Sequence, residues 1–296
     1  MPRIIIVLLA CVSCLIAGRV RADRAAMPLD GRSLLSVPRQ QAIIGWNGQE
    51  ELLILGTDRR ASMRVKVLEI LPLPSEPTIW KADAEIFETV RALMAERTAA
   101  RRPRGEMVKG LAGFAAAGEI TKHRRIGAHD IRVVQVQDAD AFVRWSREML
   151  RKWGAKIAKL PQGFRATLQR YLADGYTWFV YDIVELGPET ETIEAIGYRF
   201  LSEKVYFPLR VSMLDAGEST VDLFVISDQD LTMPHAVGQA AVTAAHAAFA
   251  ISAKDQRRLD GKLAGMFPGK GAASFRAWTL HAKTRAFTQD LNVTGR

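Results

Sequence analysis

The sequence predicts an α+β protein: a largely antiparallel sheet, a helical hairpin inserted before a central strand, and an alanine-rich helical C-terminal part. Three observations carry this prediction. An Asn-Gly pair at 47–48 lies between two apolar runs, which is typical of a β-hairpin because both turn positions favour a positive φ. The segment 176–186 is apolar on both alternating faces, as expected of a central strand. Apolar residues repeat at helical spacing between 138 and 175, which predicts two helices.

The first half of the chain is expected to supply three strands and one long helix. The strands are expected at 40–46, 51–55 and 65–71. The third should end at Pro72, because proline cannot donate a hydrogen bond to a sheet. A helix with Asp83 as its N-cap should run to residue 97, and a short helical piece near 107–117 should follow within a basic loop.

The second half is expected to open with a strand at 129–137. Asp138 should then cap the first helix of the hairpin, and Pro161 should open the second. Four strands follow without intervening helices, which predicts an antiparallel meander. They are expected at 176–186, 193–201, 205–213 and 220–226. The alanine-rich stretch 236–253 predicts a helix, and short strands are expected at 275–281 and 287–293.

The amino terminus has the three parts of a secretory signal. Met1-Pro2-Arg3 is a charged start, residues 4–18 are uncharged and mostly apolar, and Val20-Arg21-Ala22 resembles a cleavage site. The 15-residue apolar run is shorter than the ~20 residues that a membrane-spanning helix needs. We therefore expect a signal peptide at 1–22 and an exported protein, periplasmic or secreted, without a transmembrane segment. Lipoprotein cleavage at Cys11 is the alternative.

The expected mature chain is a single domain. Residues 23–38 are expected to form a loose, polar leader, and 39–296 one α+β domain with a core at 39–229 and a C-terminal extension at 230–296. Its composition, 48% hydrophobic and 25% charged, is that of an ordinary globular protein. Both cysteines, Cys11 and Cys14, lie inside the signal, so no disulfide, thiol nucleophile or thiolate metal site is expected.

Positive charge is concentrated in two windows, 97–125 and 144–170. Each contains eight Lys and Arg residues against two and one Glu. Such patches bind anionic surfaces, although charge runs are more often solvated helix faces. The sequence predicts contact with an envelope protein or an anionic envelope surface, and no nucleic acid. The candidate surface-binding residues are Arg101, Arg102, Arg147 and Arg151.

Five runs resemble a known family: QAIIGWNGQEELLIL (41–55), KVLEILPLPSEP (66–77), HDIRVVQVQDAD (129–140), TWFVYDIVEL (177–186) and YFPLR (206–210). The chain resembles a family of exported bacterial and archaeal proteins of unknown function, of the type called domain of unknown function 2330. The resemblance spans about residues 40–225 and does not extend into 231–296. It implies export and one continuous β-rich core, and it assigns no active site.

Motifs with catalytic or metal-binding chemistry are absent from the sequence. No two histidines have a metal-ligand spacing such as i, i+4 on a helix, so no metal is expected. The run GMFPGKG at 265–271 has the wrong spacing for a phosphate-binding loop, and G-x-S-x-G does not occur. No cofactor is expected.

The candidate ligand-binding residues are Asp182, Arg199, Arg210 and Trp80. Asp182 lies among apolar neighbours in its strand, and a buried carboxylate must be paired, hydrogen-bonded or neutral. Arg199 and Arg210, on neighbouring expected strands, could pair with it in a polar pocket or in a structural ion pair. Trp80 follows a proline-rich run and is expected at the surface, where an indole ring can stack on a ligand.

Taken together, these patterns predict a non-catalytic cell-envelope binding or structural protein. The alternative is a small-ligand binder or enzyme that uses a pocket near Asp182, Arg199 and Arg210. The sequence leaves open whether any reaction is catalysed.

Overall fold

The computed structural model describes residues 25–30, 33, 35–99, 123–155, 158–188, 191–192, 194–215, 217–268 and 272–295. The expected signal peptide at 1–22, the helical piece expected near 107–117, and the candidates Arg101 and Arg102 lie outside these ranges. Within them, every helix is too short or too polar to cross a membrane.

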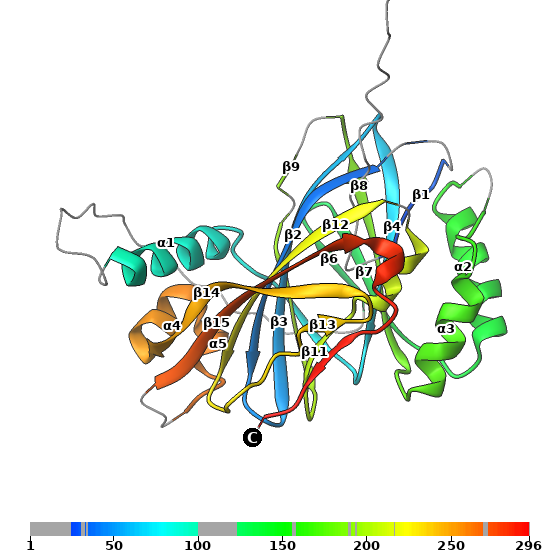
Figure 1. The fold of residues 1–296 in the computed structure, drawn as a ribbon. Helices are drawn as coiled ribbons and strands as arrows, with labels where there is room; N and C mark the ends of the chain where they lie inside the picture. The colour runs from blue at the N-terminus through cyan, green and yellow to red at the C-terminus, as the bar shows by residue number, and fades with distance from the viewer. Residues whose placement is uncertain are drawn as a thin grey trace, which may run out of the picture.

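Two sheets lie face to face, and helices cover both outer faces, so the described residues form four layers in the order α–β–β–α (Figure 1). The smaller sheet consists, in spatial order, of β1 (Ala25–Pro28), β4 (Val65–Leu73), β8 (Trp178–Leu186), β7 (His129–Gln135) and β6 (His123–Ile126). Its outer face is covered by α2 (Ala139–Lys152) and α3 (Phe164–Ala173).

The larger sheet has nine strands among the described residues. Their spatial order is β13 (Ala236–Val237), β14 (Ala240–Ser252), β15 (Ala272–Lys283), β12 (Glu218–Ser227), β2 (Leu35–Trp46), β3 (Glu50–Ala61), β10 (Ile196–Leu201) and β5 (Thr78–Lys81), with β9 (Glu191–Thr192) beside β3. The outer face is covered by α1 (Ile86–Ala99), α4 (Ala253–Leu259) and α5 (Gly261–Ala264). Only β12 and β2 pair in parallel in this part of the chain, so the predicted α+β class with largely antiparallel sheets is confirmed.

Short elements join the C-terminal end of the chain to its middle. Strand β11 (Val205–Phe207) pairs with β16 (Leu291–Val293) in a separate two-stranded sheet. The 3-10 helices η1 (Arg210–Leu214) and η2 (Thr284–Ala286) contact each other beside it. The segment from η2 to β16 therefore lies against the segment from β11 to η1, which follows β8 in the sequence.

The β2–β3 hairpin forms at the predicted Asn-Gly pair, displaced by one residue. The Asn47 N–H donates to the Glu50 carbonyl, so the two-residue turn is Gly48-Gln49, with Gly48 at φ +97°. The Asn47 Oδ1 accepts the N–H groups of Gln49 at 3.1 Å and Glu50 at 2.9 Å. The positive φ thus falls on the residue without a Cβ, and Asn47 holds the turn through its side chain.

Strand alternation sorts apolar side chains between the layers. In β2, Ile44 faces the core between the sheets, while Ile43 faces the helices α4 and α5. In β8, Val180 faces inward and Tyr181 packs beneath α2. Burying one such side chain completely contributes about 1.5–3 kcal/mol, so both faces of each sheet stabilise the fold.

Helix α2 begins where the sequence predicts. The Asp138 carboxylate accepts the N–H of Ala141 at 2.6 Å, which satisfies one of the helix's first N–H groups. One turn on, the Phe142 ring meets the Tyr181 ring edge-on, with centroids 5.2 Å apart. The Ser146 hydroxyl bonds to the Tyr181 hydroxyl, so α2 is tied to the sheet by both apolar and polar contacts.

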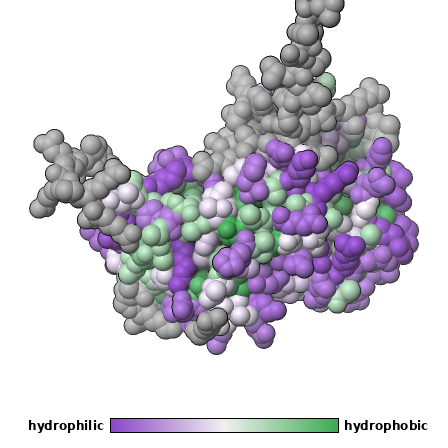
Figure 2. Space-filling view, in the orientation of Figure 1, coloured by the Kyte–Doolittle hydropathy of each residue, from purple (hydrophilic) through white to green (hydrophobic). Residues whose placement is uncertain are grey.

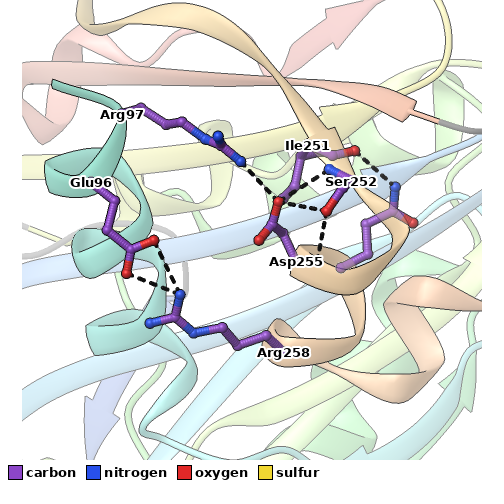
Figure 3. A network of polar contacts seen from close by, with 7 residues as sticks. Glu96, Arg97, Ile251, Ser252, Asp255 and Arg258 are labelled. Atoms are coloured by element: carbon purple, nitrogen blue, oxygen red, sulfur yellow. Dashed lines mark hydrogen bonds and ion pairs between the residues drawn. The ribbon is translucent and has the colours of Figure 1, made fainter. Parts of the chain in front are cut away.

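Two reciprocal ion pairs hold α1 to α4 (Figure 3). Arg97 donates to Asp255 at 2.9 Å, and Arg258 donates to Glu96 at 3.0 Å. Asp255 also forms a capping box with Ser252 at the start of α4. Each helix supplies one acid and one base, so the two pairs fix how α1 and α4 are rotated relative to each other. Their contribution to the free energy of unfolding is small. Exposed pairs of this kind contribute about 1 kcal/mol at most.

The prediction of an alanine-rich helical C-terminal part is wrong for 236–253. This stretch forms β13 and β14, and β14 pairs with β15 along most of its length. Phe249 stacks on Phe275 with ring centroids 4.7 Å apart, and Ile251 is buried. Alanine favours a helix by less than ~1 kcal/mol per residue, so sheet pairing and these contacts outweigh its preference.

The expected meander is also wrong. Strand β8 belongs to the smaller sheet and β10 to the larger one, while β12 pairs with β2 and β15. Half of the strand expected at 205–213 is the 3-10 helix η1. Apolar alternation predicts a strand without specifying its neighbours, which long-range packing decides.

Two expected boundaries also move. Strand β1 lies within the segment 23–38, where a loose leader was expected, because Ala26 and Met27 bury their side chains against the smaller sheet. Strand β4 continues past Pro72, which pairs with Phe179 of β8. Among the described residues, β1 pairs with β4 only from Val67 to Ile70, so Pro72 lies beyond this described pairing.

Candidate functional site

A groove opens where the C-terminal end of the chain meets the segments that flank β8 and β11. Two cavities of about 520 and 750 Å³ adjoin there, and both are lined by Asp174, Tyr176, Lys204 and Asn292. Arg210 and Asp290 line the smaller cavity, and Leu201 lines the larger one. We call this feature the Arg210 groove.

The end of α3 places two of the groove's residues. Gly175 adopts φ +86° and ends the helix, its N–H donating to the Leu172 carbonyl. The Tyr176 N–H donates to the Tyr171 carbonyl at 2.9 Å, which completes a Schellman motif. Asp174 and Tyr176, on either side of this glycine, are thereby directed into the groove.

Arg210 lines the smaller cavity of the groove, and only 12% of its side chain is exposed. Its guanidinium donates to Asp174 at 2.6 Å and lies 3.4 Å from the Asp290 carboxylate. It also stacks over the Tyr171 ring, 4.1 Å from the ring centroid. A guanidinium held by two carboxylates and an aromatic face keeps one orientation, which makes it a rigid part of the site.

Asp290 anchors this network from below. Its Oδ1 accepts the Tyr171 hydroxyl at 2.9 Å and the backbone N–H of Arg210 at 2.7 Å. Burial raises the pKa of Asp290 to about 6, although Arg210 opposes the shift. The carboxyl therefore titrates within the range of environmental pH, and its ionised form is the partner of Arg210.

Tyr176 supplies the aromatic surface of the groove, and two buried tyrosines support it. The Tyr176 ring stacks on the Tyr206 ring with centroids 5.0 Å apart, and Tyr171 meets Tyr176 at 5.9 Å. The Tyr176 hydroxyl donates to Asn292 at 3.2 Å, and burial raises its pKa to about 12. Buried Glu51 accepts the Tyr206 N–H at 2.6 Å and so holds Tyr206 from the side of the larger sheet.

The opposite wall is the proline-rich segment that the sequence analysis singled out. Ser75 follows Pro74 and exchanges two hydrogen bonds with the backbone of Leu201, at 2.8 and 3.0 Å. Leu201 itself is 63% exposed at the rim. The tip of the β2–β3 hairpin, Gly48-Gln49, completes this wall.

The structure separates the three residues from which a pocket was predicted. Asp182 is buried on β8, where its Oδ2 lies 2.6 Å from the Nδ1 of His129. Arg199, on β10, pairs with Glu50, while Arg210 belongs to the groove. Asp182 and Arg199 lie on strands of different sheets, and of the three residues only Arg210 lines a cavity described above.

Trp80 is not the exposed binding residue that the sequence predicted. It is 8% exposed, and its ring packs over Gly197 of the neighbouring strand β10. The absence of a Cβ at Gly197 makes room for the indole. Lys262 of α5 lies above the ring at 5.5 Å.

Of the candidate surface-binding residues, Arg147 and Arg151 are described and exposed on α2. Arg144 and Lys152 are exposed on the same helix. The described residues contain no group of three or more His, Cys, Asp and Glu that could hold a metal ion.

Sequence reasoning missed most of the Arg210 groove. Tyr171 reads as an inward apolar residue of its helix, and Asp174 as part of the helix end. Asp290 lies in the C-terminal stretch for which no resemblance was found. A signal was present nonetheless: Asp290 and Asn292 flank an apolar residue in the short C-terminal segment expected to form a strand.

Comparison with known protein families assigns the chain to one of them. The chain belongs to the family described as "Uncharacterized protein conserved in bacteria (DUF2330)", which matches residues 21–294. The resemblance seen in the sequence is thus confirmed, and it extends across the C-terminal part. No curated protein matches this chain.

Solved structures of baculovirus p35 show a distant likeness. The crystal structure of baculovirus p35 has 8% identity and a TM-score of 0.41, covering 88% of this chain and 97% of that one. The crystal structure of the caspase-8/p35 complex has 9% identity and a TM-score of 0.39, covering 87% and 96%. A likeness at this level says nothing about function.

Proposed function

We propose that this chain is an exported, non-catalytic binding protein of the cell envelope, and that it takes a polar ligand in the Arg210 groove. The observation that carries the proposal is the state of Arg210. A largely desolvated guanidinium lines the groove and is held by Asp174, Asp290 and the Tyr171 ring. Preorganised polar groups in a concave site are the usual mark of ligand binding.

Binding is favoured over catalysis because the two acidic groups beside Arg210 are already engaged. Asp290 accepts hydrogen bonds from Tyr171 and Arg210, and Asp174 accepts one from Arg210. A general acid or base needs a free position toward the substrate. Here the carboxylates hold the arginine in place.

The proposal is tested by native mass spectrometry of the protein recovered from its own envelope. We expect the mature chain to begin after Ala22 and to carry a bound small molecule. Lys204→Ala and Asn292→Ala should lose this mass, because both side chains line both cavities. Arg199→Gln, which changes a residue outside the groove, should keep it. If the chain carries no bound molecule under mild conditions, or if all variants retain the molecule equally, the proposal that the groove binds a ligand is overturned. An uncleaved N-terminus would overturn the proposal of export.

A second candidate function is attachment to an anionic surface through α2. Arg144, Arg147 and Arg151 are exposed on this helix, with Glu148 as the acid among them. Figure 2 shows hydrophilic residues gathered on the side of the molecule where α2 and α3 lie in Figure 1. A helix face of like charges attracts anionic lipid headgroups with an energy that salt screens.

Vesicles containing an anionic phospholipid test this second function. Binding should weaken steeply with added salt, and Arg147→Gln with Arg151→Gln should weaken it further. The matched control is Arg64→Gln with Lys254→Gln, which removes two exposed charges elsewhere. Equal loss in both double variants would show a general charge effect and sink the assignment to α2.

A further inference from the structure

The chemistry of the groove lining indicates what kind of ligand it takes. We propose that the ligand of the Arg210 groove is a neutral oligosaccharide; this inference rests on the proposed function and narrows it to one class of molecule. Three features of the lining carry it: the balance of charge, the chemistry of the uncharged groups, and the length of the groove.

The positive charge of Arg210 is already compensated within the groove. Arg210 is paired with both Asp174 and Asp290. An anionic ligand group at the guanidinium would meet two carboxylates, and a cationic one would meet the guanidinium itself. The remaining ionisable groups of the lining, Lys204 and Glu203, have opposite signs. Such a site favours an uncharged ligand, because a charged one would lose solvation without gaining a free partner.

The uncharged polar groups suit hydroxyls. Asn292, Gln289 and Gln49 line the groove, and an amide both donates and accepts hydrogen bonds, as a sugar hydroxyl does. Between them, half-buried Tyr176 lines both cavities, and its ring supplies apolar surface for the carbon face of a sugar. Amide groups around one aromatic ring match the hydroxyls and the C–H face of a saccharide.

The groove is long enough for several sugar units. Its two cavities share four lining residues, so one ligand can occupy both. Their volumes, about 520 and 750 Å³, each lie in the ~300–1,000 Å³ range that one drug-sized ligand fills. An extended chain that passes Tyr176 would use both, whereas a single sugar would leave most of the groove empty.

The test compares matched hexasaccharides by isothermal titration calorimetry with the mature protein. Cellohexaose is set against its uronic-acid counterpart, and chitohexaose against its deacetylated, cationic form. We expect at least one neutral hexamer to bind and its charged counterpart to bind about tenfold more weakly or worse. Binding of the neutral hexamer should change little between low and ~0.5 M salt, since no net charge is neutralised.

Variants connect the binding to the groove. Asn292→Ala, and separately the exposed Gln289→Ala, should each weaken the neutral hexamer about tenfold, the effect of losing about 1.4 kcal/mol of hydrogen bonding. Gln169→Ala removes a matched amide on α3 outside the groove and should leave binding unchanged. Equal loss in Gln169→Ala would overturn the assignment to the groove.

The outcomes separate this inference from the function on which it rests. Tighter binding of a charged hexamer, or a peptide in place of a sugar in the native mass spectrum, overturns the ligand class and leaves a binding protein. Failure of every hexamer while the native protein carries a non-sugar mass has the same meaning. If no hexamer binds and the native protein carries no bound molecule, both the ligand class and the proposed binding function are overturned.

Discussion

Replacing Tyr171 by phenylalanine tests the network beneath the groove with the loss of a single oxygen. The Tyr171 hydroxyl is fully buried and donates to Asp290 at 2.9 Å. The same carboxylate oxygen accepts the Arg210 N–H, and the Arg210 guanidinium stacks on the Tyr171 ring. Tyr171→Phe keeps the ring and its stacking, so the change isolates one hydrogen bond to one carboxyl.

The expected cost depends on pH because the acceptor titrates. Burial raises the pKa of Asp290 to about 6, so the carboxyl is ionised at about pH 8 and mostly protonated at about pH 5. A hydrogen bond to a charged acceptor contributes about 1.5–3 kcal/mol, and one between neutral groups about 0.5–1.5 kcal/mol. Tyr171→Phe should therefore lower the free energy of unfolding by about 2 kcal/mol at about pH 8 and about 1 kcal/mol at about pH 5.

Urea denaturation at the two pH values, followed by circular dichroism, measures both costs. The control is Tyr206→Phe, which removes a buried hydroxyl that donates to the neutral Pro72 carbonyl at 3.1 Å. It should cost about 1 kcal/mol at both pH values. If Tyr171→Phe showed the same cost at both, or if the control varied as strongly with pH, the link between Tyr171 and an ionised Asp290 would be refuted.

Three further predictions concern stability. Gly197→Ala should lower stability by about 1–3 kcal/mol, because an added Cβ overlaps the Trp80 ring; thermal unfolding should show part of this recovered when Trp80→Leu is added. Asp138→Ala should lose the cap of α2 and cost about 1 kcal/mol in urea denaturation. The folded state binds the Asp290 proton more tightly than the unfolded chain, so stability should fall by about 2 kcal/mol as pH rises from about 4 to about 6, a slope that Asp290→Asn removes.

Each of these can fail in a definite way. A Gly197→Ala protein as stable as the parent would show that the indole moves at no cost. An uncapped α2 with unchanged stability would mean that packing alone sets the helix start. A slope with pH that survives in Asp290→Asn would belong to other groups.

Local chemistry made parts of the fold predictable. Asn47 and Gly48 predicted their hairpin, since a turn with positive φ is decided by the residues within it. Asp138 predicted the start of α2 for the same reason, since a cap signal acts over one helical turn. The hairpin was displaced by one residue because either residue of the pair can take the left-handed position.

Long-range packing decided what the sequence analysis missed. The alanines of β14 carry a helical preference that Phe249 and Ile251 overcome only once β15 lies beside them. Asp182 and Arg199 looked like neighbours because their strands are consecutive among the long ones, yet each strand joined a different sheet. The burial of Trp80 could not be predicted, because it depends on Gly197, which lies more than a hundred residues away in sequence.

The candidate site shows the same contrast between local sequence signals and long-range packing. Arg210 could be singled out as a charge among apolar residues, whereas its partners could not. Asp174 precedes Arg210 in the sequence and Asp290 follows it. Neither segment alone indicates that its carboxylate pairs with Arg210. A site assembled from a helix end, a 3-10 helix and the last strand is visible only after the chain has closed on itself.

The parallel pairing of β2 with β12 has a consequence for how the protein is made. Val221 pairs with Gln40, so the middle of the larger sheet joins two segments that lie far apart in the sequence. Closing so long a loop costs entropy before any contact forms, and folds dominated by such pairings form slowly. The hairpin of β2 and β3 must wait, with one edge unpaired, until β12 has been synthesised. A polypeptide that stays open through most of its translation is well suited to threading through a translocation pore before it folds, which fits the export proposed from its amino terminus.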